Sequence, residues 1–225
     1  MKKLFLLLSI FFILTSCGKS NEERINDLIA EATKASLYIP ESYDPVSTQC
    51  DTLYRDIINP ANIDKSAKIM SLIHSIQSTQ REMEYCVRQR DFLSGKSAEL
   101  YNDYAKRVIS GEETIDGLKA QANKLFAELQ KDFYNDRGFY GFIVEHRFRA
   151  KNNMGTVMFG DMIYIINKDI TEVVAAYDTS DNDFVEFMQM VEAIQEIGEN
   201  YNLDEINLVE ICANIKSVYE LRYDH

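Results

Sequence analysis

The spacing of hydrophobic residues changes twice along the chain and separates helical stretches from a strand-like one. Between residues 20 and 135, apolar residues recur every three or four positions, a period typical of amphipathic helices. Between residues 139 and 178 they alternate with polar residues, as in strands that bury one face. The helical period returns in residues 181–221. The pattern predicts an α+β fold with N-terminal antiparallel helices, a three-stranded antiparallel β-meander and two C-terminal helices.

The first predicted helix begins with a capping box, in which Ser20 is the N-cap and Glu23 is the N3 residue. Its apolar stripe continues to about Leu37. Residues 38–45 contain two prolines, and we expect an extended linker there because the residue before a proline avoids the helical region. A short helix is expected next, from Ser47 to Ile58.

The longest helical pattern covers residues 62–93. A second helix is expected to stop at Ser110-Gly111, and a third continues to Phe133. Long helices with short breaks are typical of antiparallel hairpins, whereas a coiled coil is less favoured because charged heptad flanks are not sustained. After the alternating region, helices are predicted at residues 181–198 and beyond Asn202, which is expected to cap the last one.

The alternating region predicts strands at residues 140–151, 156–166 and 170–177. The apolar faces of the first two strands match across a four-residue turn at residues 152–155, and this match sets their register. The resulting cross-strand pairs are Phe148 with Phe159, Val144 with Ile163, and His146 with Asp161.

The expected pair of His146 and Asp161 has two interpretations. A histidine oriented by a carboxylate can act as a general base, which makes these two residues the catalytic candidates of the chain. Alternatively, they form a buried and mutually satisfied polar pair that holds the hairpin in register. The second interpretation is favoured, because the sequence places no serine or cysteine nucleophile beside them.

Arg147, Arg149 and Lys151 form the only basic stripe, on the opposite face of the first strand. They are candidate ligand-binding residues for a carboxylate, a phosphate or an acidic glycan. A solvated sheet face, paired with Asp and Glu residues of the same chain, is the favoured alternative.

The N-terminus has the three parts of a secretory signal peptide. Lys2 and Lys3 are followed by an apolar run at residues 4–14 and by the small residues before Cys17. A membrane-spanning helix needs about 20 apolar residues, so this run is too short to span a bilayer. Residues 1–16 are therefore predicted to be a signal peptide. Residues 17–225 are expected to form one α+β domain, with its helical part at 20–135, its meander at 139–178 and its closing helices at 181–221.

The sequence Leu14-Thr15-Ser16-Cys17-Gly18 resembles the lipobox of bacterial lipoproteins. The resemblance implies cleavage before Cys17 and acylation of that cysteine, with palmitate among the chains, so that the domain is anchored to a membrane. Gly18 stands where an aspartate would favour retention at the inner membrane, so the resemblance implies the outer membrane. Whether the domain faces the periplasm or the cell surface stays open.

Two further segments resemble uncharacterised small lipoproteins of Bacteroidota. These are residues 141–155, with Val144, His146 and Phe148-Arg149-Ala150, and the proline-containing segment 38–45. The resemblance extends over residues 1 to about 198 and implies a helical body with a β-hairpin and a location in the cell envelope. It implies no activity.

The chain is acidic, with a formal net charge of −12. Removal of Lys2 and Lys3 with the leader leaves 22 basic and 36 acidic residues, a net charge of about −14. Such a balance argues against nucleic acid as a partner and suits a basic one. Cys50, Cys86 and Cys212 leave two possibilities open, one disulfide with a free thiol or three thiols.

No phosphate-binding, dinucleotide-binding, hydrolase-elbow or zinc-protease motif is present, the histidines are scattered, and we expect no cofactor and no metal site. The sequence therefore favours a lipid-anchored envelope protein that binds an envelope protein or another ligand without catalysing a reaction. An immunity-type or inhibitor lipoprotein that neutralises a basic partner is the alternative. An enzyme using His146 and Asp161 is the least favoured possibility.

Overall fold

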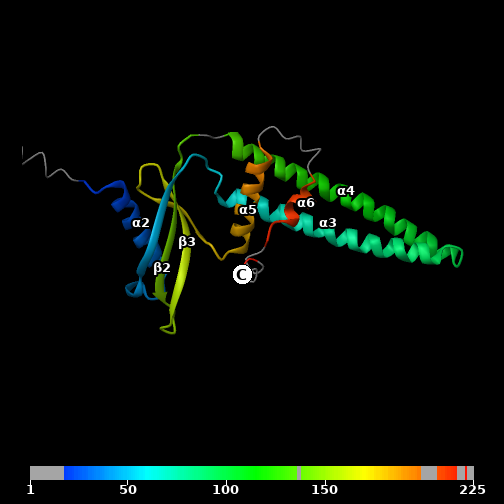
Figure 1. The fold of residues 1–225 in the computed structure, drawn as a ribbon, viewed down its shortest axis with the longest axis horizontal. Coiled ribbons are helices and arrows are strands. Elements are labelled where there is room, and N and C mark those ends of the chain that lie inside the picture. Colours follow the sequence, from blue (N-terminus) through cyan, green and yellow to red (C-terminus); the bar gives the residue numbers. More distant parts are fainter. Residues whose placement is uncertain (1–17, 136–137, 199–206, 217–220, 222–225) are drawn as a thin grey trace, which may run out of the picture. The chain divides into compact units, whose positions relative to one another are not determined.

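The computed structural model describes residues 18–135, 138–198, 207–216 and 221 (Figure 1). The predicted signal peptide and the lipidation candidate Cys17 lie outside the described residues. The chain folds into two compact units that alternate along the sequence. Unit 1 holds the residues up to Leu53 and Phe139–Asp178, and unit 2 holds Tyr54–Gly138 and the residues from Thr179 onward.

In the described part of unit 1, helix α2 (Asn21–Ser36) packs on a four-stranded antiparallel sheet. The unit also contains the short 3-10 helix η1 (Pro40–Ser42). Its strands lie in the order of the chain and are β1 (Asp44–Leu53), β2 (Gly141–Lys151), β3 (Val157–Asn167) and β4 (Val173–Asp178). The predicted α+β class is confirmed, but the prediction of three strands is wrong because a fourth precedes the meander.

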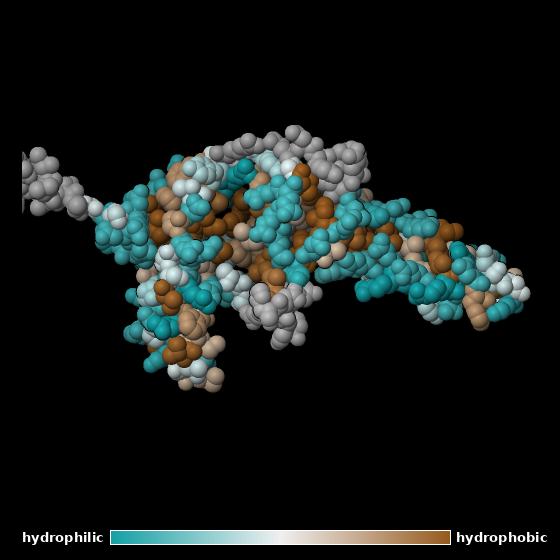
Figure 2. All heavy atoms as spheres, in the orientation of Figure 1, coloured by the Kyte–Doolittle hydropathy of each residue, from teal (hydrophilic) through white to brown (hydrophobic). Residues whose placement is uncertain are grey.

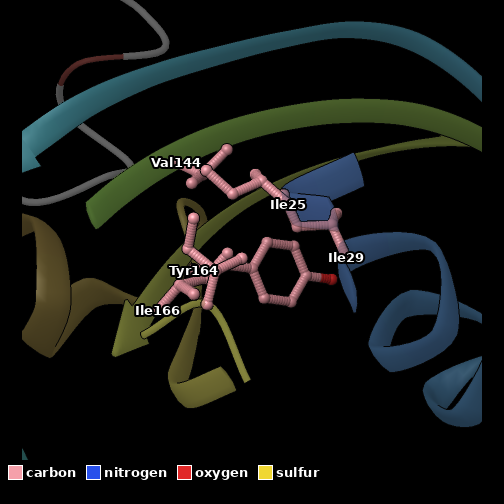
Figure 3. Close-up of a cluster of buried hydrophobic side chains, with 6 residues drawn as sticks. Ile25, Ile29, Val144, Tyr164 and Ile166 are labelled. Atoms are coloured by element: carbon pink, nitrogen blue, oxygen red, sulfur yellow. The ribbon is translucent and has the colours of Figure 1, made fainter. Parts of the chain in front are cut away.

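Helix α2 begins as the sequence predicts. The Glu23 N–H donates to the Ser20 hydroxyl at 3.1 Å, and the Ser20 N–H donates to the Glu23 carboxylate at 2.8 Å, which completes the capping box. The helix lays Ile25 and Ile29 against the sheet. Figure 3 shows the Tyr164 ring of β3 directed toward Ile29. The buried cluster also contains Val144 of β2 and Ile166 and Ile170.

Strand β1 corrects the helix expected from Ser47 to Ile58. This segment is rich in Ser and Thr, and it pairs along its whole length with β2, from Asp44 opposite Arg149 to Leu53 opposite Gly141. The partner strand lies almost 90 residues later, so nothing local in the sequence signals the pairing. Pairing with β2 satisfies the backbone of both segments and overrides the helical spacing of the few apolar residues.

The register of β2 with β3 differs from the predicted one by one residue. His146 lies opposite Met162 and Arg147 lies opposite Asp161. The turn is closed by the Asn152 N–H, which donates to the Thr156 carbonyl, so that three residues form its loop. Gly155 has φ +77°, the left-handed conformation that such a loop needs at its last residue. Because side chains alternate, the shift by one residue moves every side chain of β3 to the other face.

Side-chain packing at Gly160 also favours the observed register. Gly160 lies directly opposite Phe148, whose ring covers it. A Cβ atom at Gly160 would lie 2.4–2.9 Å from three atoms of that ring, which is closer than carbon atoms can approach. The large ring and the absent side chain therefore complement each other across the two strands.

Unit 2 is built on a long antiparallel helical hairpin of α3 (Pro60–Leu93) and α4 (Ala98–Asn135). The bounds predicted for α3 are confirmed within two residues. The predicted break at Ser110-Gly111 is wrong, because α4 runs through it. A Cβ atom at Gly111 would lie 2.5 Å from Cγ of Met83. The absence of a side chain at Gly111 therefore lets α3 pack closely against α4.

Two shorter helices complete unit 2, α5 (Asn182–Ile197) and α6 (Leu208–Ala213). Helix α5 confirms its prediction. Asp181 caps its first turn by accepting from the N–H groups of Asp183 and Phe184, and Gly198 with φ +84° ends it. The predicted cap Asn202 lies outside the described residues. Within the described part of the chain, no helix has the length and apolar character needed to cross a membrane.

Candidate functional site

His146 lies in the interior of unit 1, with only 3% of its surface exposed. It belongs to the face of β2 that α2 covers, as the alternation predicts. Its Nε2 atom is 2.9 Å from the Tyr43 hydroxyl, and its Nδ1 atom is 2.9 Å from the Thr48 hydroxyl. The ring stacks on Phe148 with an interplanar angle of 17°. Both ring nitrogens are therefore occupied by hydrogen bonds within the unit.

Burial governs the electrostatics of this polar cluster. Loss of hydration lowers the pKa of His146, because the charged imidazolium is the form that burial disfavours. The same effect raises the pKa of Tyr43 and of Tyr164. The Tyr164 hydroxyl is 2.8 Å from the Thr33 hydroxyl of α2, which in turn donates to the Ile29 carbonyl. The cluster is thus a set of neutral, mutually satisfied groups that joins α2 to the sheet.

Asp161 does not meet His146. It lies on the opposite face of β3 and forms an ion pair with Arg147, with 3.2 Å between Oδ1 and Nε. The predicted His146–Asp161 contact is wrong because the three-residue loop shifts the register by one residue. The structure therefore does not bring the two catalytic candidates together, and the histidine is enclosed rather than open to a substrate.

Two of the three residues of the basic stripe form ion pairs with acidic residues of the same sheet, as the favoured interpretation predicts. Arg149 contacts Asp44 of β1 at 2.6 Å, and Arg147 contacts Asp161. Lys151 is exposed, and its backbone N–H donates to the Ser42 hydroxyl at 2.8 Å. Arg147 also lies over the Phe159 ring, 5.3 Å from its centroid.

A shallow pocket of about 400 Å³ opens at this end of the sheet. It brings Arg149 and Lys151 together beside the 3-10 helix η1. Its apolar floor comes from Ile39, Ala150 and Val157, and its rim carries Glu41 and Asp44 as well as the two cations. Because two acidic and two basic side chains line it, the pocket has no strong preference for an anion.

An exposed apolar surface adjoins the pocket at the tip of the β2–β3 hairpin. Its members are Met154, Val157, Met158 and Phe159, which expose 54% to 81% of their area. We call these four residues the hairpin-tip surface; apolar atoms are visible at this end of the sheet in Figure 2. The sequence reasoning missed it, because the wrong register placed Phe159 on the buried face.

The hairpin-tip surface lies at the end of unit 1 opposite to the start of α2 (Figure 1). Arg24, in the first turn of α2, donates to the carbonyls of Asp169 and Ile170 in the β3–β4 connection. The β2–β3 turn is at the other end of the same strands. Eleven residues of strand at about 3.4 Å each separate the two ends by roughly 35 Å.

The three later cysteines are free thiols, with Cys50 exposed on β1 and Cys86 and Cys212 buried in unit 2. Burial, with a smaller contribution from Glu186, raises the pKa of Cys212 to about 12. Among the described residues, no three His, Cys, Asp or Glu side chains gather as a metal site would require. In comparisons with known proteins, no family model, no curated protein and no solved structure matches this chain.

Proposed function

We propose that this chain is a lipid-anchored binding module of the cell envelope, and that its hairpin-tip surface contacts a protein partner. One observation carries the proposal. Four large apolar side chains are exposed near one end of unit 1: Met154 in the turn, Val157 and Phe159 on one face of β3, and Met158 on its other face. Exposed apolar side chains that cluster are typical of interaction sites, whereas scattered ones are not.

The surroundings of Phe159 support a protein as the partner. Two arginines flank this ring, Arg149 directly across the strand pair and Arg147 over its face. Each arginine is neutralised by an aspartate, so the surface is locally uncharged within an acidic chain. Aromatic residues and arginines are enriched at the centres of protein interfaces, and pre-formed ion pairs reduce the cost of ordering side chains on binding.

The proposed location rests on the leader and on the position of α2. Cleavage before Cys17 and its acylation, with palmitate among the chains, would place a membrane three residues before the N-cap Ser20. Two or three acyl chains hold a protein at a bilayer stably, and Gly18 favours the outer membrane. The hairpin-tip surface then faces away from that bilayer, about one strand length from it. This direction favours an envelope protein over the anchoring membrane as its contact.

Site-specific photo-crosslinking in native membranes tests the proposal. A photoreactive amino acid at position 159 is expected to give a discrete crosslinked product, and the combined changes Met158→Ser and Val157→Ser are expected to abolish it. Phe139 supplies the matched control, because it is an exposed phenylalanine of the same unit just before β2, at the other end of that strand. The same probe at position 139 is expected to give no such product.

The result also separates the proposed module from its alternative. If crosslinking at positions 139 and 159 is the same, or if Met158→Ser and Val157→Ser have no effect, the hairpin-tip surface is not the binding site. A product that disappears at high salt yet survives both serine substitutions would instead favour neutralisation of a basic partner by the acidic surface. Replacement of Cys17 by serine tests the anchor separately, since the protein should then leave the membrane fraction.

A further inference from the structure

The α3–α4 hairpin of unit 2 ends in a tight and well-defined tip. The 34 residues of α3 and the 38 residues of α4 give each arm a length of roughly 50 Å at 1.5 Å per residue. The reversal needs only four residues, from Ser94 to Ser97. The Lys96 and Ser97 N–H groups both donate to the Leu93 carbonyl, and Gly95 has φ +72°.

Large apolar side chains surround this reversal without being packed. Phe92 exposes 65% of its surface, Leu100 exposes 50% and Tyr101 exposes 37%. All three lie within one helical turn of the reversal, so they share the end of the hairpin. The Lys96 ammonium lies 3.5 Å from the centre of the Phe92 ring, where a cation is attracted to the aromatic face. We call these four residues the helical tip.

The region around the reversal does not share the acidic excess of the chain as a whole. Residues 84–107, which are centred on the reversal, contain five Lys or Arg and four Asp or Glu residues, a formal charge of +1. Three of the cations are paired along the helices, Arg88 with Glu84, Arg90 with Asp91 and Arg107 with Asp103. In the part of the chain that the structure describes, Lys96 and Lys106 form no ion pair.

From these observations we propose that the helical tip docks on an anionic lipid surface, with Phe92 and Leu100 inserted among the lipids and Lys96 at the headgroups. Aromatic and aliphatic residues beside lysine are the composition of an interfacial lipid contact, because the lysine stem lies along apolar groups while its ammonium reaches the polar layer. Each cation near an anionic bilayer adds attraction, which an acidic surface would not provide.

The size of the tip favours lipid over protein. Fully exposed aromatic side chains present about 150–250 Å² each, so the partly exposed Phe92 and Tyr101 together with Leu100 offer on the order of 300 Å². A stable protein interface buries about 800 Å² on each partner, and the convex end of two helices provides no flat surface of that size. A bilayer requires no complementary shape, so a small apolar tip is sufficient for a weak contact.

The absence of tryptophan from the sequence allows a direct test. Leu100→Trp places a single tryptophan at the helical tip. The variant is made in a chain that begins at Gly18 and therefore keeps every described residue. Vesicles of phosphatidylethanolamine and phosphatidylglycerol, with brominated lipid as a quencher, are expected to shift its emission to the blue and to quench it. Phosphatidylcholine vesicles are expected to give at least a fivefold weaker effect. Phe92→Ser in the same background should weaken binding about tenfold, since it removes much of one buried aromatic side chain.

Ile109→Trp is the matched control, because Ile109 is as exposed as Leu100 and lies on the same helix away from the tip. It is expected to show neither the shift nor the quenching. Equal quenching at positions 100 and 109 would overturn docking through the tip. No quenching at position 100 with millimolar lipid would overturn lipid as the partner. If Phe92→Ser removes a crosslink to an envelope protein while vesicles leave the fluorescence unchanged, the tip is a protein interface and the proposal is wrong.

Discussion

The two units differ in the surroundings of one buried hydroxyl in each. In unit 1, the hydroxyl of Thr33 reaches from α2 to Tyr164 on the sheet, and His146 has partners at both nitrogens. In unit 2, the hydroxyl of Ser66 is buried on α3 and has no hydrogen-bond partner among the described residues. The hydroxyl of Thr33 therefore helps to place the helix of unit 1, whereas the hydroxyl of Ser66 adds no such bond to unit 2. Elsewhere in unit 2 the buried Asn62 and Gln130 donate to backbone carbonyls.

The units also differ in the sequence distance of their contacts. The β1–β2 pairing joins Asp44–Leu53 to Gly141–Lys151, across the whole α3–α4 hairpin. The α3–α4 packing joins helices that are four residues apart in the chain. Local contacts form early and at a low cost in loop entropy, whereas the sheet has to wait for a distant segment. This contrast implies that the units respond separately to mutation.

The largest effect is expected from Phe126→Ala in the seam of unit 2. Phe126 is fully buried on α4, and its truncation should lower the stability of unit 2 by about 3–5 kcal/mol. Amide hydrogen exchange is expected to accelerate in α3 and α4 and to stay unchanged in β2 and β3. Phe92→Ala, at an exposed site of the same hairpin, is the control. Equal loss of protection in the sheet would show that the two units unfold as one body.

A smaller effect, confined to unit 1, is expected from Gly160→Val. The valine side chain would occupy the space of the Phe148 ring, and overpacking of this kind costs about 1–3 kcal/mol. Protection should fall in β2 and β3 and persist in α3. Adding Phe148→Val should restore part of the loss, because it removes the clashing ring. If Gly160→Val alone changes nothing, the ring does not cover Gly160.

Removal of one buried hydroxyl should have opposite signs in the two units. Thr33→Val leaves the Tyr164 hydroxyl without its partner on α2, and we expect unit 1 to lose about 1–2 kcal/mol. Ser66→Ala removes a group with no partner and introduces a better helix former, so unit 2 should gain about 0.5–1 kcal/mol. Exchange in α2 and in α3 measures the two changes. The same sign in both would contradict the distinction between the units.

The same contrast explains which elements the sequence could predict. Helices α2 and α5 were predicted almost to the residue because their signals are local, the capping box at Ser20 and the cap and stop at Asp181 and Gly198. Strand β1 was not, because its only partner is distant. Helix propensity predicts a break at Gly111 because it takes no account of the neighbouring helix. In the structure, the Met83 side chain of α3 occupies the space that a Cβ atom at Gly111 would need.

For the candidate site, the sequence predicted the sheet face of each side chain better than the residue opposite it on the neighbouring strand. Alternation placed His146 inside and Arg147 and Arg149 outside, which the structure confirms. The residue opposite His146 on β3 depends on the length of the β2–β3 loop. A loop one residue longer than the observed one places Asp161 there instead of Met162. Gly155 and Gly160 carried the missing information, since one requires a left-handed loop position and the other requires a large residue opposite. The exposure of Val157 and Phe159 follows from the register, which places them on the face of the sheet away from α2.

The smallest expected effect is a pH dependence of unit 1 through His146. Burial lowers the pKa of this histidine in the folded state, while the unfolded chain keeps a value of about 6.5. Below that pH the unfolded state binds the proton more readily, so the stability of unit 1 should fall as the pH drops below about 6.5 and level off above it. Exchange in β2 and β3, measured between pH 7.5 and 5, should show this decline after correction for the intrinsic exchange rate.

His146→Gln is the informative variant for this pH dependence. A glutamine can still donate to one neighbour and accept from the other, but it does not titrate, so the decline in β2 and β3 should flatten even if the variant is less stable at pH 7.5. His74→Gln, on the exposed side of α3, is the matched histidine control and should leave the profile of unit 1 intact. A decline that persists in His146→Gln would assign the pH dependence to other groups.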